Sequence, residues 1–330
     1  MSEKDVEGDE ISKTRSVHNE ATLAVTQKPT FWKKWFLNQT KIDTLLLAMI
    51  LLSSVTALLG NALLMFLIQV EYHLHIPKYF FLSQLAFMDI CQTLIIVPKM
   101  STDFLIPGNP ISLAGCGTQI LLTLTIGASE SLLLAVMSYD RYVAICHPLQ
   151  YPILTSKRVC LSLAAGVWCG GTLNAFINMV YVIQLPYCHS KEINHFFCEI
   201  PALLKLSCSD TSTYETAVFI SGVILLLIPS SIILASYARV LSAILRMSSA
   251  KGRHKALATC SSHLTVVGLF YGGTMFMYMR PNAYHSPDQD NIIPMFYTIV
   301  TPVLHPLIYS LRNRDVLGAL RKLFGKYNSS

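Results

Sequence analysis

Four charged side chains lie within long apolar segments, where they could bind an ion or act as a charge switch. Asp89 and Glu130 each interrupt an apolar run, and the adjacent Asp140 and Arg141 lie near the end of the run that contains Glu130. An ionisable group inside a bilayer costs about 2.5 to 3.5 kcal/mol on insertion scales, so such groups seldom occur by accident. Neighbouring residues do not share a helix face. The simplest joint role of Asp140 and Arg141 is therefore a neutralised pair at a membrane boundary, which can be broken to release the arginine.

Asp89 and Glu130 admit two interpretations. Both side chains could point into a helical bundle and share a cation, which we take to be sodium because hard cations prefer oxygen ligands and paired carboxylates repel each other without one. Alternatively, one or both carboxyl groups are protonated and hydrogen-bonded, with no ion. We favour the ion site. Glu130 precedes Arg141 by eleven residues, which is about 16 Å along a helix, so an ion there would lie between the outer half of the bundle and the charge pair.

The composition excludes a soluble fold, because hydrophobic residues make up 52% of the 330 residues and charged residues only 13%. A membrane-spanning helix needs about 20 apolar residues. Seven segments reach that length: 44–70, 79–100, 113–145, 159–183, 213–241, 256–279 and 292–311. The sequence therefore predicts an all-α membrane protein, a seven-transmembrane helix bundle over residues 44–312. A disordered extracellular tail, 1–43, would precede it, and a short amphipathic C-terminal helix and tail, 313–330, would follow along the cytoplasmic lipid surface.

Lysine and arginine are unevenly distributed between the two sides of this bundle. Of the 25, seven lie in the N-terminal tail, four in the loops after the second, fourth and sixth segments, and fourteen on the opposite side. Positive charge is retained in the cytosol, so we predict an extracellular amino terminus and a cytoplasmic carboxyl terminus. The glycosylation sequon at Asn38 agrees with that topology.

Four of the nine cysteines lie on the predicted outer side, in an oxidising compartment. Cys116 is near the start of the third segment, and Cys188, Cys198 and Cys208 lie in one long loop. Four cysteines allow three pairings, and the order of the loop favours Cys116 with Cys198 and Cys188 with Cys208. The others are predicted to pack as small apolar groups. The chain has no convincing zinc-ligand spacing.

The motifs of common enzyme classes are missing from the sequence, namely a histidine–glutamate metal pair, a nucleophile elbow and a phosphate-binding loop. We therefore predict a protein without catalytic activity, without a cofactor apart from the possible sodium ion, and without a nucleic-acid partner. A transporter or channel would also hold carboxylates within the membrane. Such proteins normally have repeated halves and broken helices, and the sequence has no such internal symmetry.

Six motifs occur in order along the chain. They are Gly60-Asn61, 77–83 (PKYFFLS), 137–146 (MSYDRYVAIC), Ser236-Tyr237, 255–264 (KALATCSSHL) and 306–313 (PLIYSLRN). Any one could arise by chance, but the ordered set is very specific. With these motifs the chain resembles the odorant receptors, a branch of the rhodopsin-like G-protein-coupled receptors, along nearly all of its length after the tail.

The resemblance implies a plasma-membrane receptor that binds a small apolar odorant and activates a heterotrimeric stimulatory G protein of the olfactory type, raising cyclic AMP. It implies that Asp140 and Arg141 form an inner latch, and that Asp89 and Glu130 form the ion site. Tyr237 and Tyr309 would become the partners of Arg141 once it is freed. The cytosolic segments 141–152 and 239–255 would form the G-protein surface. A related chemosensor outside olfaction is an open alternative.

Three features depart from the family pattern. His305 precedes Pro306, where the family usually has asparagine. A protonated ring there could compete with sodium, or a neutral ring could fill the same hydrogen bond, and we favour the neutral ring. His305 is thus a third member of the predicted ion site. Lys78 stands where the family favours methionine and can snorkel at the membrane edge. The N-terminal tail is longer than is usual.

Helical spacing from these motifs predicts a ligand cavity between the outer halves of the third, fifth, sixth and seventh segments. Its predicted lining is Thr123, Leu124, Gly127, Ala128, Ile200, Ser221, Leu225, Tyr271, Thr274, Met275, Tyr278, Met295 and Thr298. These residues are apolar with scattered hydroxyl groups and carry no charge. They favour a neutral, moderately hydrophobic ligand with one hydrogen-bonding group. Each position could instead belong to ordinary helix packing.

Overall fold

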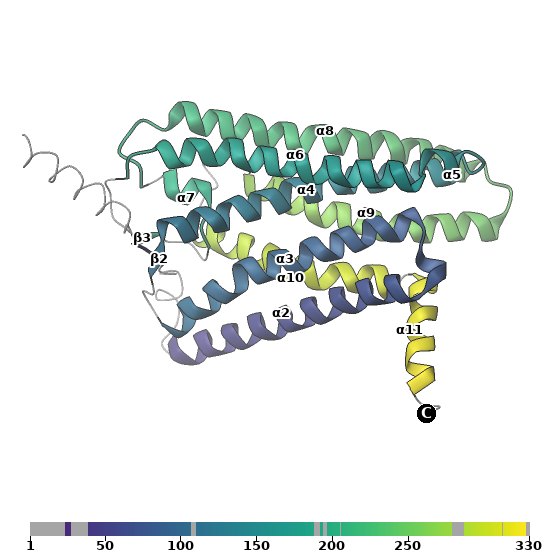
Figure 1. Ribbon diagram of the computed structural model, residues 1–330, viewed down its shortest axis with the longest axis horizontal. Helices are drawn as coiled ribbons and strands as arrows, with labels where there is room; N and C mark the ends of the chain where they lie inside the picture. The colour runs from purple at the N-terminus through teal and green to yellow at the C-terminus, as the bar shows by residue number, and fades with distance from the viewer. Residues whose placement is uncertain are drawn as a thin grey trace, which may run out of the picture.

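Long helices make up most of the part of the chain that the computed structural model describes, residues 24–27, 39–106, 110–187, 192–193, 197–204, 206–278, 287–311 and 313–327. They are α2 (Gln39–Val70), α3 (Pro77–Leu105), α4 (Leu113–Cys146), α6 (Lys157–Gln184), α8 (Ser212–Leu245), α9 (Ala250–Tyr278) and α10 (Pro287–Leu311). In Figure 1 these helices lie roughly along the long axis of the molecule and form one elongated bundle. The last helix, α11 (Arg314–Tyr327), turns away from that axis at one end.

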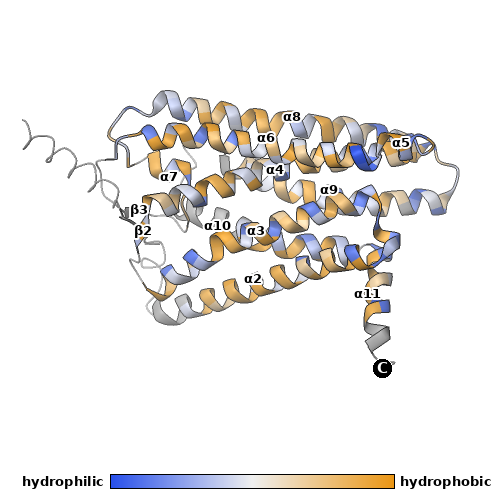
Figure 2. Cartoon of the chain, in the orientation of Figure 1, coloured by the Kyte–Doolittle hydropathy of each residue, from blue (hydrophilic) through white to orange (hydrophobic). Residues whose placement is uncertain are grey.

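Five of the described helices are long and apolar enough to cross a membrane, by length and composition: α2 over Thr44–Val70, α3, α4, α6 and α8. Apolar residues, coloured orange in Figure 2, occur along the whole length of these helices, and many of their side chains are exposed on the outside of the bundle. Leu52, Leu173 and Leu234 are 70%, 62% and 71% exposed. A soluble monomer rarely exposes apolar surface on this scale. The structure therefore has the surface of a multi-pass membrane protein.

The central helix is α4, which packs against α3, α6, α8 and α9. Its side chains Leu133, Leu134 and Met137 are buried in one apolar cluster, together with Leu85 of α3 and Tyr309 of α10. Residues three and four apart lie on one face of a helix, but α4 is surrounded and so buries residues on several faces. The charged residues of α4 are consequently held inside the bundle.

A proline interrupts the hydrogen bonds of α10, and a side chain of α2 replaces the missing bond. Pro306 has no backbone N–H, so the carbonyl oxygen of Pro302, four residues earlier, loses its usual partner. The side-chain amide of Asn61 donates to that carbonyl at 2.9 Å. Gly60 allows the close approach, because a Cβ there would lie 3.2 Å from Cγ of Pro306. These contacts fix α10 against α2 beside His305.

Short strands lie at the end of the bundle opposite α11 (Figure 1). The strands β1 (Ala24–Gln27), β2 (Pro110–Ser112) and β3 (Glu192–Ile193) form a sheet in the order β2-β1-β3. The central strand β1 is antiparallel to β2 and parallel to β3. The sequence did not predict this strand, which belongs to the N-terminal tail. The sheet therefore joins the tail to the loops before α4 and after α6.

The observed helices extend past several of the predicted segments. α8 ends at Leu245 rather than at residue 241, and α9 begins at Ala250 rather than at residue 256. The segments were defined by apolar runs, whereas a helix continues through polar residues beyond the lipid as long as its backbone hydrogen bonds can form. The connections contain the short elements η2 (Tyr72–Leu74), α5 (Tyr151–Leu154) and α7 (Ile200–Leu204).

Candidate functional site

The Asp140–Arg141 pair near the end of α4 is buried and closed. Nη1 of Arg141 lies 3.6 Å from Oδ2 of Asp140. The hydroxyl group of Tyr151, the first residue of α5, donates to Oδ1 of the same carboxylate at 2.9 Å. Burial, together with the neighbouring Asp140 carboxylate, raises the pKa of the Tyr151 hydroxyl, so this group stays a neutral donor. Asp140 is thus held by a cation and by a hydrogen bond from the following loop.

Tyr237 and Tyr309, the predicted later partners of Arg141, lie in the same region of the bundle. The Tyr237 hydroxyl is 2.7 Å from Nδ1 of His263, and the two rings are stacked with their centroids 5.8 Å apart. Within the described part of the chain, the buried Tyr309 hydroxyl and Nε of Arg141 have no hydrogen-bond partner. Unused hydrogen-bonding groups therefore lie close to the closed pair.

Sequence reasoning missed two members of this cluster, Tyr151 and His263. Tyr151 lies in the predicted G-protein segment 141–152, and His263 lies in the motif 255–264, so both were in segments already singled out. The sequence predicts no role for either residue, because it does not show which loop folds back onto Asp140 or which face of α9 meets α8.

His305 joins the two carboxylates that are buried within the bundle. Its Nδ1 atom is 3.1 Å from Oδ1 and 3.0 Å from Oδ2 of Asp89. Its Nε2 atom is 4.0 Å from Oε1 of Glu130. The three residues come from α10, α3 and α4, and all are buried. The structure thus brings together the three residues that the sequence predicted for an ion site.

These three residues do not fit a sodium site in the geometry that they adopt. A hard cation needs several oxygen ligands, but both carboxylate oxygens of Asp89 face Nδ1 of His305. A sodium ion at Asp89 would compete with the proton on that nitrogen or meet a positively charged ring. Among the residues that the structure describes, no group of three His, Cys, Asp or Glu side chains is arranged to hold a metal ion. The arrangement is a histidine–carboxylate cluster.

Two of the predicted ligand-lining residues, Tyr271 and Leu225, belong to a hydrogen-bond network between helices. The Tyr271 hydroxyl lies 3.0 Å from Oγ of Ser131 and donates to the Ser131 carbonyl at 3.0 Å. The Ser131 hydroxyl in turn donates to the carbonyl of Leu225 at 2.9 Å. This network joins α9 and α8 to α4, and Ser131 is a member that sequence reasoning missed.

Thr123 and Gly127, one turn apart on α4, differ from the rest of the predicted lining. In the described residues, the buried Thr123 hydroxyl has no hydrogen-bond partner. A Cβ placed at Gly127 would meet no atom within 4 Å. The other described members are buried or half-buried along these helices and α7: Leu124, Ala128, Ile200, Ser221, Thr274, Met275 and Thr298. The side chains of Tyr278 and Met295 lie outside the description.

The predicted disulfide between Cys116 and Cys198 is confirmed. The Cα atoms of the two residues are 5.4 Å apart, and both residues are buried. The backbone N–H of Cys198 donates to the side chain of Gln119 on α4 at 3.0 Å, which holds the loop close to the bridge. Cys208 is also disulfide-bonded. Cys188, its predicted partner, lies outside the described residues, as does the sequon residue Asn38.

Comparison with known proteins gives a consistent result. The family model described as "Olfactory receptor" matches residues 49–326. The chain is 55% identical over 285 residues to olfactory receptor 2V1 of Mus musculus, an alignment that covers 86% of this chain and 90% of that protein. It is 51% identical over 290 residues to olfactory receptor 2T1 of Homo sapiens, and this alignment covers 88% of this chain and 79% of that protein. It is 52% identical over 293 residues to olfactory receptor 2T27 of Homo sapiens, and this alignment covers 89% of this chain and 92% of that protein.

Proposed function

This chain belongs to the olfactory receptor family, whose members are G-protein-coupled receptors and not enzymes, and from that premise we propose that it binds a small, neutral, mostly apolar odorant. Binding would activate a stimulatory olfactory-type G protein and raise cyclic AMP. The observation that carries this proposal is the family match over residues 49–326 in a chain whose Asp140–Arg141 pair is closed inside the bundle. A closed pair is what a resting signalling state requires.

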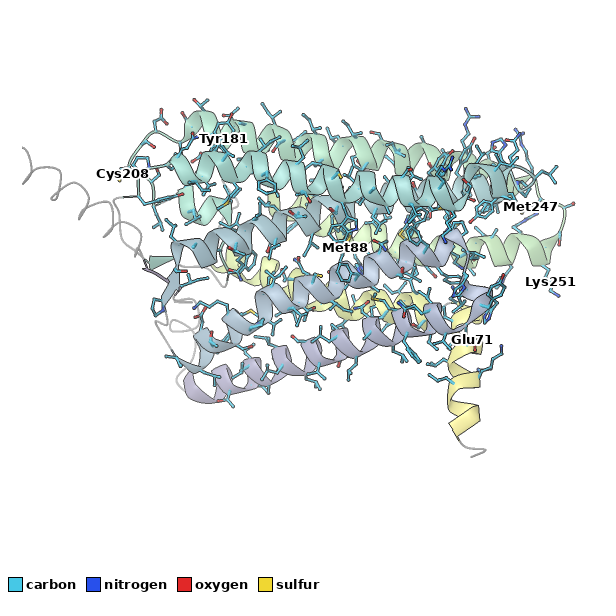
Figure 3. The ribbon with its side chains drawn as sticks, in the orientation of Figure 1. Glu71, Met88, Tyr181, Cys208, Met247 and Lys251 are labelled. Carbon is cyan, nitrogen blue, oxygen red and sulfur yellow. A yellow bond between two sulfur atoms is a disulfide. The ribbon has the colours of Figure 1, made fainter. Side chains whose placement is uncertain are left out.

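The proposed topology is a seven-span bundle in the plasma membrane, with α9 and α10 as the last two spans. The amino terminus and Asn38 are extracellular, and the carboxyl terminus is cytoplasmic. Figure 3 supports this arrangement, because Cys208 lies at one end of the bundle and Lys251 at the other. Disulfides form in oxidising compartments, and positive charge is retained in the cytosol. On α11, Val316 and Ala319 are buried whereas charged side chains are exposed, which suits a helix lying on the inner lipid surface.

The proposed ligand position is beside the outer half of α4, at Thr123 and Gly127. A buried hydroxyl without a partner costs free energy unless a hydrogen bond is supplied. A ligand with one hydrogen-bonding group could supply it at Thr123, and the missing side chain at Gly127 leaves room for an apolar group nearby. The described lining carries no charge, so an amine or a carboxylate would lack a counter-ion.

Activation is proposed to be a shift between two populations of the receptor. An odorant that binds more tightly to a state with the end of α9 near Ala250 moved outward would favour that state. That movement separates α9 from α8 and so breaks the Tyr237–His263 contact. Tyr237 and Tyr309 then become available to Arg141 as the pair with Asp140 opens.

The proposal is tested by measuring cyclic AMP in cells that express the receptor, across a panel of neutral odorants and matched amines and carboxylates. We expect a response to at least one neutral apolar compound, and no response in mock-transfected cells. Ligand-gated ion flux in cells that lack the G protein would contradict the proposal and favour a channel.

Replacing Thr123 with valine tests the ligand position. The substitution keeps the shape of the side chain but removes one hydrogen bond, worth about 0.5 to 1.5 kcal/mol, so we expect the odorant concentration for half-maximal response to rise about two- to tenfold. Thr118→Val on the same helix is the control, because Thr118 is exposed and its hydroxyl bonds to the Ala114 carbonyl at 2.9 Å. If the odorant is equally potent at Thr123→Val and at Thr118→Val, the ligand does not bind at Thr123.

A further inference from the structure

We propose that His305 takes the place of a bound sodium ion in this receptor, so that Asp89 and Glu130 have an internal partner and the bundle does not respond to sodium. The inference concerns the interior of the bundle, where α3, α4 and α10 meet, and it does not depend on odorant or G protein.

The first step concerns how the imidazole ring occupies the site. One ring nitrogen faces both carboxylate oxygens of Asp89, at 3.0 and 3.1 Å, and the other nitrogen lies 4.0 Å from Glu130. His305, Asp89 and Glu130 are only 1%, 4% and 9% exposed, so water contributes little to the solvation of either acid. A cation that binds carboxylate oxygens sits about 2.3 to 2.6 Å from them, on the example of calcium. The ring nitrogen Nδ1 already lies against the two oxygens that such an ion would use.

The second step concerns the charge. An imidazole with protons on both nitrogens is a cation that can donate toward two acids, while a neutral imidazole donates to one. A ring that donates from Nδ1 to the Asp89 carboxylate, as the doubly protonated ring and one of the two neutral tautomers do, places a hydrogen where sodium would bind. An asparagine at this position would be a shorter and neutral side chain. It would leave the two carboxylates without a partner of opposite charge, and sodium could then enter.

The third step concerns what holds the ring in position. The residue after His305 is Pro306, which packs against Gly60 of α2. The carbonyl of Pro302, just before the ring in the chain, accepts a hydrogen bond from Asn61 of α2. Because α10 is held against α2 on both sides of His305, the backbone that carries the ring is anchored beside the two acids.

Sodium binding can be measured directly on the purified receptor. We would record the line width of the sodium-23 NMR signal, and the melting temperature, while sodium chloride replaces N-methylglucamine chloride at constant ionic strength. Wild type is compared with His305→Asn, with Asp89→Asn and with the double variant. Neither measurement uses odorant or G protein, so a failure here is distinct from a failure of the proposed signalling function.

For wild type we expect no sodium-dependent broadening beyond that of Asp89→Asn, and no change in melting temperature. His305→Asn should show broadening that saturates and a melting temperature that rises by a few degrees, because a ligand that binds only the folded state stabilises it. The double variant should lose both effects. If His305→Asn does not fold, His305→Gln provides a longer neutral amide.

Two results would overturn the inference. One is sodium-dependent broadening in wild type that Asp89→Asn removes, a comparison that stands whether or not the His305 variants fold. The other is an absence of broadening in a folded His305→Asn receptor, which would show that the ring is not what excludes the ion.

Discussion

Replacing Gly171 with leucine lowers the amount of folded receptor at the cell surface several-fold. Gly171 lies on the buried face of α6, where a Cβ would be 2.6 Å from the Thr125 carbonyl oxygen and 2.9 Å from the Ser129 backbone nitrogen. Because both atoms belong to the backbone of α4, the two helices must move apart to admit any side chain. Overpacking a core costs about 1 to 3 kcal/mol, and occasionally more, in a molecule whose net stability is of the order of 5 to 15 kcal/mol.

Gly166 provides the matched control, because it lies on the same helix but on its exposed side. A Cβ there would meet no atom within 4 Å. We expect Gly166→Leu to reach the surface as wild type does, since leucine faces the lipid and forms helix about 1 kcal/mol more favourably than glycine. Antibody labelling of an extracellular tag measures the surface amount, and thermal melting of purified protein measures stability. Equal surface amounts for Gly171→Leu and Gly166→Leu would show that α4 and α6 are not in this close contact.

Arg141→Ala abolishes the odorant response, whereas Asp140→Asn raises the signal in the absence of odorant. Alanine removes the guanidinium that the freed latch must offer to its later partners. Asparagine keeps the shape of Asp140 but not its charge, so the closed state loses an ionic hydrogen bond or contact. Such an interaction is worth about 1.5 kcal/mol or more, which corresponds to about a tenfold change in a two-state equilibrium.

Tyr151→Phe separates the effect of the charge from that of the hydrogen bond. It removes the donor that lies 2.9 Å from Asp140 but leaves the charge pair in place. We expect a smaller rise in basal cyclic AMP than in Asp140→Asn, because Tyr151→Phe removes only the hydrogen bond to the carboxylate, whereas Asp140→Asn weakens that hydrogen bond and the ion pair together. All variants are compared at equal surface amounts. An unchanged odorant response in Arg141→Ala, or lower basal signalling in Asp140→Asn, would contradict the role of the latch.

The predicted ion site illustrates what the sequence can predict about a buried site and what it cannot. Asp89, Glu130 and His305 were each recognisable as polar groups in apolar segments. The contacts among them could not be predicted, because Asp89 and His305 are 216 positions apart in the sequence and their contact depends on how α10 is rotated against α3. The sequence favoured sodium and a neutral ring, and both stay predictions; what the structure adds is the contact of the imidazole with Asp89. The hydrogen bond of Tyr271 to Ser131 of α4 likewise depends on how α9 is rotated in the bundle.

The amino-acid sequence by itself determined the helical segments, their order, and the pairing of Cys116 with Cys198, which the structure confirms. Apolar runs and motif order are local properties, and they persist whatever the chain packs against. Only the tertiary structure decided that Tyr151 bonds to Asp140, that β1 of the tail joins β2 and β3, and that His305 lies between two acids. Each of these contacts depends on the rotation of a helix by a fraction of a turn or on the path of a loop, and only the packing of the whole bundle sets those.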